Sequence, residues 1–137
     1  AAVVVIIPEL CPSGKLVLIT QFRPAVGNRV LAFPAGICDE SSPAKQAEIE
    51  LREETGYQGR VTSVSPRLRS NPASLYVVHM HIEEDLEVNR QPSPSPEPAE
   101  DIKVVIVEQD ALADVIDKHA AAGVDIAASV YYYSIIK

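Results

Sequence analysis

The stretch from Phe33 to Tyr57 constrains the fold of this chain more than any other. Its second half predicts a helix over Pro43–Thr55, because proline suits a first helical turn and Ser41 or Ser42 can cap it. Gly56 suits the residue just past the end of the helix. Alanines and branched aliphatic residues give this helix an apolar side, which a packed surface helix requires.

Three carboxylates stand on the predicted helix, at Glu50, Glu53 and Glu54. At 3.6 residues per turn, positions i, i+3 and i+4 share one face. Like charges on one face repel, so they add nothing to the stability of the helix itself. A divalent cation would turn that repulsion into ligation, and hard oxygen ligands suit Mg²⁺ or Mn²⁺. The spacing therefore indicates a candidate metal site.

The order of FPAG, a loop and a helix ending in ELREETGY resembles the box of the Nudix hydrolases. The family pattern is Gly, five residues, Glu, seven residues, Arg-Glu, an apolar residue, any residue, Glu-Glu, any residue and Gly. Read back from its last glycine, this chain matches the pattern at Glu50, Leu51, Glu53, Glu54 and Gly56.

The chain departs from the box in three places. Ile49 stands where the family has arginine, Ser41 stands where it has its first glutamate, and the spacing from Gly36 is one residue short. Whether Glu40 replaces the missing glutamate is left open by the sequence. In the family the arginine pairs with a carboxylate and supports the metal ligands, which Ile49 cannot do. The resemblance therefore implies a metal site that is mostly present but weakly supported.

The flanking segments resemble the ADP-ribose and ADP-sugar pyrophosphatase branch of the family. They are QFRP at 21–24 before the box and GYQG at 56–59 after the helix. The resemblance implies an α/β/α sandwich with a mixed β-sheet, formed by residues 1–137 as a single domain. In this branch an N-terminal extension contributes to dimerisation and to adenine binding, and we expect this chain to lack it.

The resemblance also implies roles for individual residues. A proline-rich loop over 83–100 carries a catalytic glutamate in this branch, which Glu100 matches and for which Glu97 is the alternative. Arg23 is implied to bind phosphate, which its planar guanidinium suits. The remaining expected roles are metal ligation by the Ala35 carbonyl, Glu50, Glu53 and Glu54, substrate binding at Gly36, and a second catalytic role for Glu53.

The implied function is Mg²⁺-dependent hydrolysis of the pyrophosphate bond in ADP-ribose or another nucleoside diphosphate sugar, with Mn²⁺ as the alternative cofactor. The products would be AMP and a sugar phosphate. The departures from the box favour an alternative, a catalytically degenerate domain that acts as a binding or structural subunit. Either a homodimer or a larger assembly is compatible with both of these hypotheses.

Composition excludes two other classes of function. The net charge of −7 argues against a nonspecific nucleic-acid surface, which requires a basic patch. The apolar segment Ala1–Ile7 is too short to span a bilayer and lacks the basic flank of a signal peptide. Cys11 and Cys38 lack metal-type spacing and are expected to be free thiols in a reducing compartment, either cytoplasmic or organellar.

The rest of the chain predicts a series of strands and two helices. Pro8 is expected to end the first strand, and Asp125 to cap the last helix. His79 and His81 lie at i, i+2, a spacing that permits metal ligation but is more often ordinary strand packing. The expected strands are Ala2–Ile7, Lys15–Phe22, Val30–Phe33, Gly59–Leu68, Leu75–Glu84 and Asp101–Val107, and the expected helices are Glu108–Ala122 and Ile126–Ile136.

Overall fold

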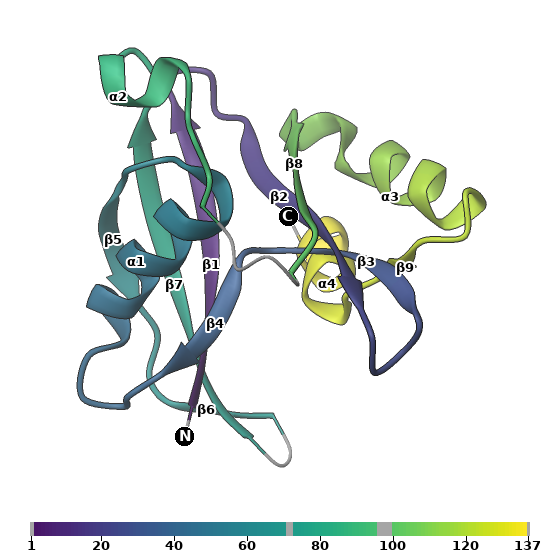
Figure 1. Ribbon diagram of the computed structural model, residues 1–137, viewed down its shortest axis with the longest axis horizontal. Coiled ribbons are helices and arrows are strands. Elements are labelled where there is room, and N and C mark those ends of the chain that lie inside the picture. The colour runs from purple at the N-terminus through teal and green to yellow at the C-terminus, as the bar shows by residue number, and fades with distance from the viewer. Residues whose placement is uncertain (1, 71–72, 96–99, 137) are drawn as a thin grey trace.

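The computed structural model describes residues 2–70, 73–95 and 100–136, which form one large sheet flanked by helices (Figure 1). The strands are β1 Ala2–Cys11, β2 Leu16–Arg23, β3 Asn28–Ala32, β4 Ala35–Cys38, β5 Arg60–Val64, β6 Leu68–Ser70, β7 Ala73–Glu83, β8 Ile102–Val107 and β9 Asp125–Ile126. The helices are α1 Pro43–Thr55, α2 Glu87–Arg90, the short 3₁₀ turn η1 Gln109–Ala111, α3 Leu112–Ala121 and α4 Ala128–Ile136.

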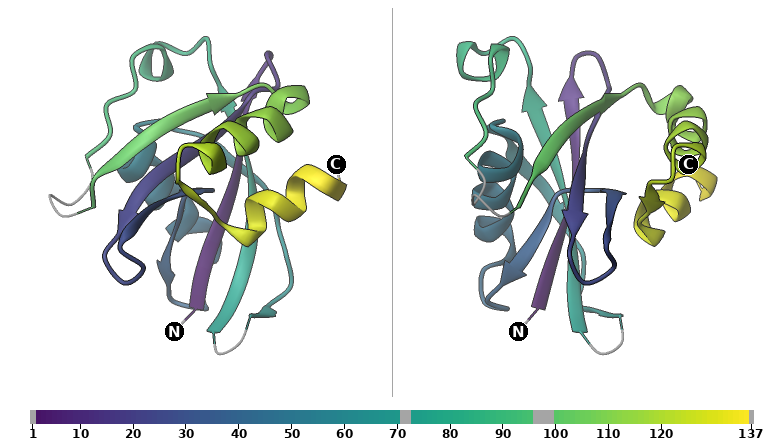
Figure 2. Two further views of the ribbon diagram at one scale, coloured as in Figure 1. Left: turned by 90° about the vertical axis from the view of Figure 1, so that its right-hand side faces the viewer. Right: turned by 45° about the vertical axis from the view of Figure 1, so that its right-hand side comes forward.

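The sheet separates two layers of helices (Figure 2). Its strand order is β5-β7-β1-β2-β3-β9, with β4 paired to β1, β6 to β7 and β8 to β2. The β1–β7 and β3–β9 pairs are parallel and the others antiparallel. Helix α1 packs with Leu51 on one face, and α3 and α4 pack with Ile116 and Val130 on the other. This arrangement confirms the predicted α/β/α sandwich with a mixed sheet.

The first strand is longer than predicted, because it continues through Pro8 to Cys11. The N–H of Ile6 donates to Pro34 O at 2.9 Å and that of Leu10 to Lys15 O at 2.8 Å, so even-numbered N–H groups of β1 point to one side. On that side β4 pairs only with residues 2–5, and β2 pairs at Glu9. Pro8 therefore falls where the neighbouring strand changes, and its missing N–H removes no ladder bond.

Helix α1 has the predicted bounds. Ser42 is its N-cap residue, although its side chain makes no capping hydrogen bond. At the other end Gly56 has φ +80°, the left-handed conformation that glycine adopts at low cost, and its N–H donates to Arg52 O at 2.9 Å. A Cβ at Gly56 would overlap the backbone of Ser93. The proline-rich segment therefore lies directly against the C-terminal end of α1.

Three further segments differ from the sequence prediction. Part of 83–100 forms the helical turn α2, where the buried Asn89 side chain donates to Gln58 O at 3.0 Å and to Glu83 O at 2.9 Å. The predicted helix over 108–122 divides into η1 and α3. Asp125 belongs to β9, since it pairs with Val30, and α4 begins later than expected. Among the described residues, no helix is both long and apolar enough to cross a membrane.

Candidate active site

Glu54 is the most deeply placed carboxylate of the α1 cluster. Its side chain is 4% exposed and faces the start of β4, where the Ala35 N–H donates to its Oε1 at 3.2 Å. Burial raises the pKa of Glu54 to about 8, and the nearby charges of Glu50, Glu100 and Glu53 add to the shift, although the Ala35 hydrogen bond opposes it. Without a cation, this carboxylate is therefore costly to ionise.

Glu50 lies one turn earlier on the same helix and is half-buried. Gln46 Nε2 donates to its Oε1 at 3.1 Å. Burial raises the pKa of Glu50, and the charges of Glu53 and Glu100 raise it further against the effect of the Gln46 bond. A Cβ at Gly36 would overlap the Glu50 carboxyl group, so glycine is the residue that leaves this carboxyl in place. Gly36 therefore shapes the site through its lack of a side chain.

Glu53 and Glu100 complete the group. Glu53 is exposed at the rim, and its backbone carbonyl accepts a hydrogen bond from Ser95 N at 2.8 Å. Glu100 is half-buried, and its charge contributes to the raised pKa of both Glu50 and Glu54. Four predicted site carboxylates, from α1 and from the segment before β8, thus lie close enough to interact. The alternative residue Glu97 lies outside the described residues.

The structure adds a residue that the sequence analysis missed, Arg29 on β3. Its guanidinium donates to Asp101 Oδ2 at 2.8 Å and to Asp101 O at 3.1 Å. It also donates to Thr20 O at 3.0 Å and to Thr20 Oγ1 at 2.9 Å. Asp101 directly follows Glu100 and has φ +45°, an uncommon conformation for a non-glycine residue. Arg29 therefore fixes the backbone that positions Glu100.

The residues that depart from the box make contacts away from the carboxylates. Ile49 is 40% exposed on the surface of α1. The Ser41 N–H and hydroxyl both donate to Asp39 Oδ1, at 2.8 and 2.9 Å, which lowers the pKa of Asp39. Glu40 accepts hydrogen bonds from Arg67 at 3.2 Å and from Tyr76 Oη at 3.4 Å. Glu40 is therefore engaged with Arg67 and Tyr76 at a partly exposed position.

Arg23 lies at the end of β2 and is exposed. It lines a pocket of about 340 Å³ together with Gln21, Val26 and Val30. Within the described part of the chain, no hydrogen bond or ion pair joins Arg23 to the carboxylate group. The phosphate-binding role of Arg23 therefore stays a prediction.

Comparisons with known proteins find several relatives of this chain. The ADP-sugar pyrophosphatase of Mus musculus is 36% identical over 126 residues, covering 88% of this chain and 58% of the relative. The ADP-ribose pyrophosphatase of Saccharomyces cerevisiae is 33% identical over 99 residues, covering 69% and 43%. That of Bacillus subtilis is 31% identical over 77 residues, covering 55% and 42%. No protein-family model matches the chain.

The sandwich fold and the carboxylate-bearing helix define a Nudix-type domain. With these relatives, they place the chain in the Nudix hydrolase superfamily. Within it, the chain is similar to the ADP-ribose and ADP-sugar pyrophosphatases. It spans about half the length of the relatives that it matches.

The donor set of the α1 cluster fits a hard divalent cation. All of its side-chain donors are carboxylate oxygens, the ligands that Mg²⁺ and Mn²⁺ prefer. Burial is the main cause of the raised pKa values of Glu50 and Glu54, and a cation bound to these carboxylates would favour their ionised forms. The missing side chain of Gly36 leaves room for the Glu50 carboxyl beside β4. Fold, charge and ligand type therefore agree on the class of ion.

Proposed function

We propose that this chain is a Mg²⁺-dependent hydrolase of the pyrophosphate bond in ADP-ribose or another nucleoside diphosphate sugar. Mn²⁺ is the alternative cation. Water adds across the phosphorus–oxygen bond that links the two phosphates, and the products are AMP and a sugar phosphate. The observation that carries the proposal is the convergence of Glu50, Glu53 and Glu54 with Glu100, which comes from a separate segment.

In this proposal the site residues take the predicted roles. Glu50, Glu53 and Glu54 hold the cation, together with the carbonyl of Ala35. A divalent cation held there supplies charge neutralisation for the phosphates and activation of water.

Two residues act on the reactants. Glu100 orients the attacking water and takes its proton, and Glu53 is the second candidate for that role. Arg23 balances the charge of a phosphate group through its planar fork of donors. Gly36 contributes to substrate binding by leaving the Glu50 carboxyl in place, since a Cβ at this position would overlap it.

Arg29 acts through Glu100 and is a positioning residue. Its bonds to Asp101 and Thr20 hold the chain where the proline-rich segment meets β8. A catalytic carboxylate that is misplaced by about 1 Å can lose on the order of 10²-fold in rate. Substitution of Arg29 should therefore lower turnover without removing any ligand of the cation.

A second function is favoured by one observation, the exposed Ile49 at the position of the family arginine. Loss of such support for a metal ligand costs roughly 10–100-fold in affinity or activity. A domain weakened in this way can still bind a nucleotide sugar and serve as a binding or structural subunit. A homodimer and a larger assembly remain the two proposed contexts for it.

One assay separates these functions. The purified chain is incubated with Mg²⁺ or Mn²⁺ and a panel of nucleoside diphosphate sugars, and release of AMP and sugar phosphate is followed. Turnover that disappears in the double variant Glu53→Gln, Glu54→Gln, but not in Glu48→Gln on the exposed side of α1, supports hydrolysis. Calorimetric binding of ADP-ribose without turnover supports the binding subunit. Absence of both refutes the proposed function.

A further inference from the structure

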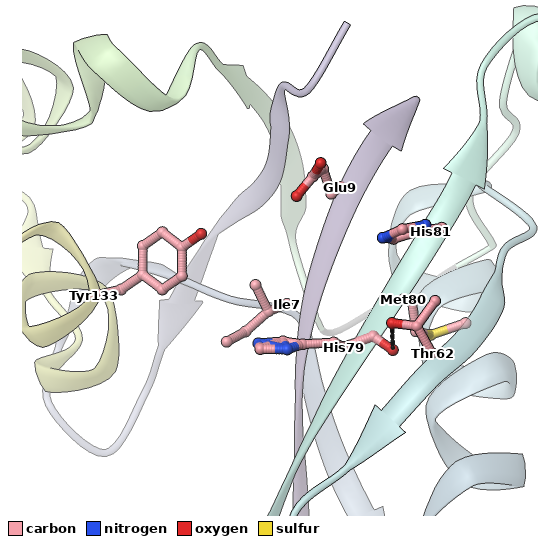
Figure 3. A pocket seen from close by; sticks show the side chains of 7 residues that line it. All are labelled: Ile7, Glu9, Thr62, His79, Met80, His81 and Tyr133. Atoms are coloured by element: carbon pink, nitrogen blue, oxygen red, sulfur yellow. Dashed lines mark hydrogen bonds between the residues drawn. The ribbon is translucent and has the colours of Figure 1, made fainter. Parts of the chain in front are cut away.

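A second group of chemically active side chains lies at the far ends of β1 and β7. These strands pair in parallel, with Glu9 opposite His81 and Cys11 opposite Glu83. Alternation along a strand sends neighbouring side chains to opposite faces. Leu10 faces the core beneath α1, so Glu9 and Cys11 face the other side of the sheet. Figure 3 shows the ring of His81 directed from β7 toward β1 on this side.

Three donor atoms converge there. One atom each from Glu9, Cys11 and His81 lies within 4.8 Å of the others, and all three residues are half-buried. Tetrahedral coordination with bonds of about 2.0–2.3 Å places ligand atoms about 3.5 Å apart. Contraction of about 1 Å is therefore enough to close the group on an ion.

The carboxylate of this group is already oriented by the surrounding structure. Gln109 Nε2 donates to Glu9 Oε1 at 3.4 Å and to Gly14 O at 2.7 Å. Tyr133 Oη donates to Gln109 Oε1 at 3.2 Å. Carboxylates that ligate metals are characteristically held by such outer hydrogen bonds. The chain from Tyr133 through Gln109 to Glu9 therefore resembles the support of a built site.

The charges around Cys11 also favour a cation. Glu83 lies opposite Cys11 in the β1–β7 pair and Glu84 directly follows Glu83, whereas Arg60 of β5 lies opposite His81. Acidic groups on β1, on β7 and just after it thus outnumber the single opposing arginine at the start of β5. A cation at this position would meet a negative local potential.

We propose that Glu9, Cys11 and His81 form a binding site for one zinc-class divalent cation. A thiolate, an imidazole and a carboxylate are all ordinary zinc ligands, and a mixed sulfur, nitrogen and oxygen set disfavours Mg²⁺. Three protein ligands leave a fourth position open. Glu9 and His81 also line a pocket of about 190 Å³ (Figure 3), so solvent or a small ligand has access to that position.

This site differs from the α1 cluster in face and in chemistry. The α1 cluster is composed of oxygen donors, whereas this group contains a sulfur and a nitrogen. The sequence left open whether the His79 and His81 pair ligates a metal. The structure includes only His81 in the group, because the exposed His79 ring is directed toward Ile7 (Figure 3). His79 is therefore a matched control, two residues away on the same face of the same strand.

The test uses the full chain in excess Mg²⁺, which occupies oxygen-rich sites. Zn²⁺ affinity is measured by calorimetry, and Co²⁺ is used as a spectroscopic probe, because a thiolate ligand gives a charge-transfer absorption that carboxylates do not. The wild-type chain should bind one Co²⁺ with that absorption. Cys11→Ser should abolish the absorption, and His81→Asn should weaken Zn²⁺ binding at least about tenfold. His79→Asn should bind like the wild type.

Two further measurements keep the proposal open to refutation. Zn²⁺ should slow alkylation of Cys11 by iodoacetamide, and Gln109→Ala should weaken Zn²⁺ binding by about 10–100-fold, as expected for loss of an outer hydrogen bond. Absence of the thiolate absorption in the wild-type chain with Co²⁺ overturns the proposal. This measurement does not depend on the folding of any variant. Thiolate absorption that persists in Cys11→Ser also overturns the proposal, because it would place the ion at Cys38. Equal weakening of Zn²⁺ binding by His79→Asn and His81→Asn overturns it as well.

Discussion

Replacing Glu54 with glutamine should stabilise the cation-free protein at alkaline pH. The carboxyl has an ordinary pKa of 4.5 and a pKa of about 8 in the folded chain. Below pH 4.5 the Glu54 carboxyl is protonated in both the folded and the unfolded chain, so it does not change the free energy of unfolding. As pH rises from 4.5 to about 8, this carboxyl ionises in the unfolded chain but stays protonated in the folded one. The free energy of unfolding therefore falls until the folded carboxyl also ionises. At 1.36 kcal/mol per pKa unit, the loss reaches at most about 5 kcal/mol.

Glutamine removes this loss, because it stays neutral and its side-chain oxygen can still accept from the Ala35 N–H. We expect a gain of about 2–5 kcal/mol at pH 9 in chelator, and almost none at pH 4. For a domain of this size, the unfolding entropy converts that gain into about 7–17 °C in melting temperature. With Mg²⁺ the wild type should become the more stable of the two proteins. The cation binds the ionised Glu54 and stabilises the wild type, whereas it stabilises the variant less.

The assay is urea unfolding at pH 4, 7 and 9, with chelator and with Mg²⁺. Glu48→Gln is the matched control, since it removes one negative charge from an exposed position of the same helix. It corrects for the general relief of net charge in this acidic chain. Parallel pH profiles for the wild type and Glu54→Gln would refute the reasoning, because they would mean that the folded carboxyl ionises as easily as the unfolded one.

Three shorter predictions concern the proposed hydrolase. Glu100→Gln should lower turnover by about 10²-fold or more with nearly unchanged substrate binding; full activity in single-turnover measurements would exclude Glu100 as the base. Gly36→Ala should weaken Mg²⁺ binding in calorimetry, because the new methyl group displaces the Glu50 carboxyl, and equal affinity would contradict that. Ile49→Arg should tighten the Mg²⁺ site or raise activity, since the exposed position admits arginine; an unchanged variant would show that the loss is already compensated.

The sequence predicted local structure well where neighbouring residues determine it. Helix α1 has the expected bounds because its proline and its glycine act within one turn of each end. The same is true of the shared face of Glu50 and Glu54, which follows from helical spacing. Glu100 is far from α1 along the chain, so no local pattern connects it with Glu50 and Glu54. Its assignment came from the family resemblance.

Features that depend on pairing between distant strands could not be predicted. Pro8 is compatible with β1 only because one edge of this strand pairs with β4 before the proline and with β2 after it. The meeting of Glu9 with His81 depends on the parallel register of β1 and β7, which nothing near either residue encodes. The contact of Arg29 with Asp101 depends in turn on β2, which pairs with both β3 and β8.

The Arg29 contact determines how the candidate site should respond to ionic strength. Dissolved salt screens attraction between partly exposed charges, and Asp101 is 61% exposed in this pair. Only one of the four hydrogen bonds of the guanidinium, however, ends on a carboxylate; the others end on two carbonyls and a hydroxyl. Screening leaves those three almost untouched. The placement of Glu100 should therefore tolerate salt, which a simple ion pair at the same position would not.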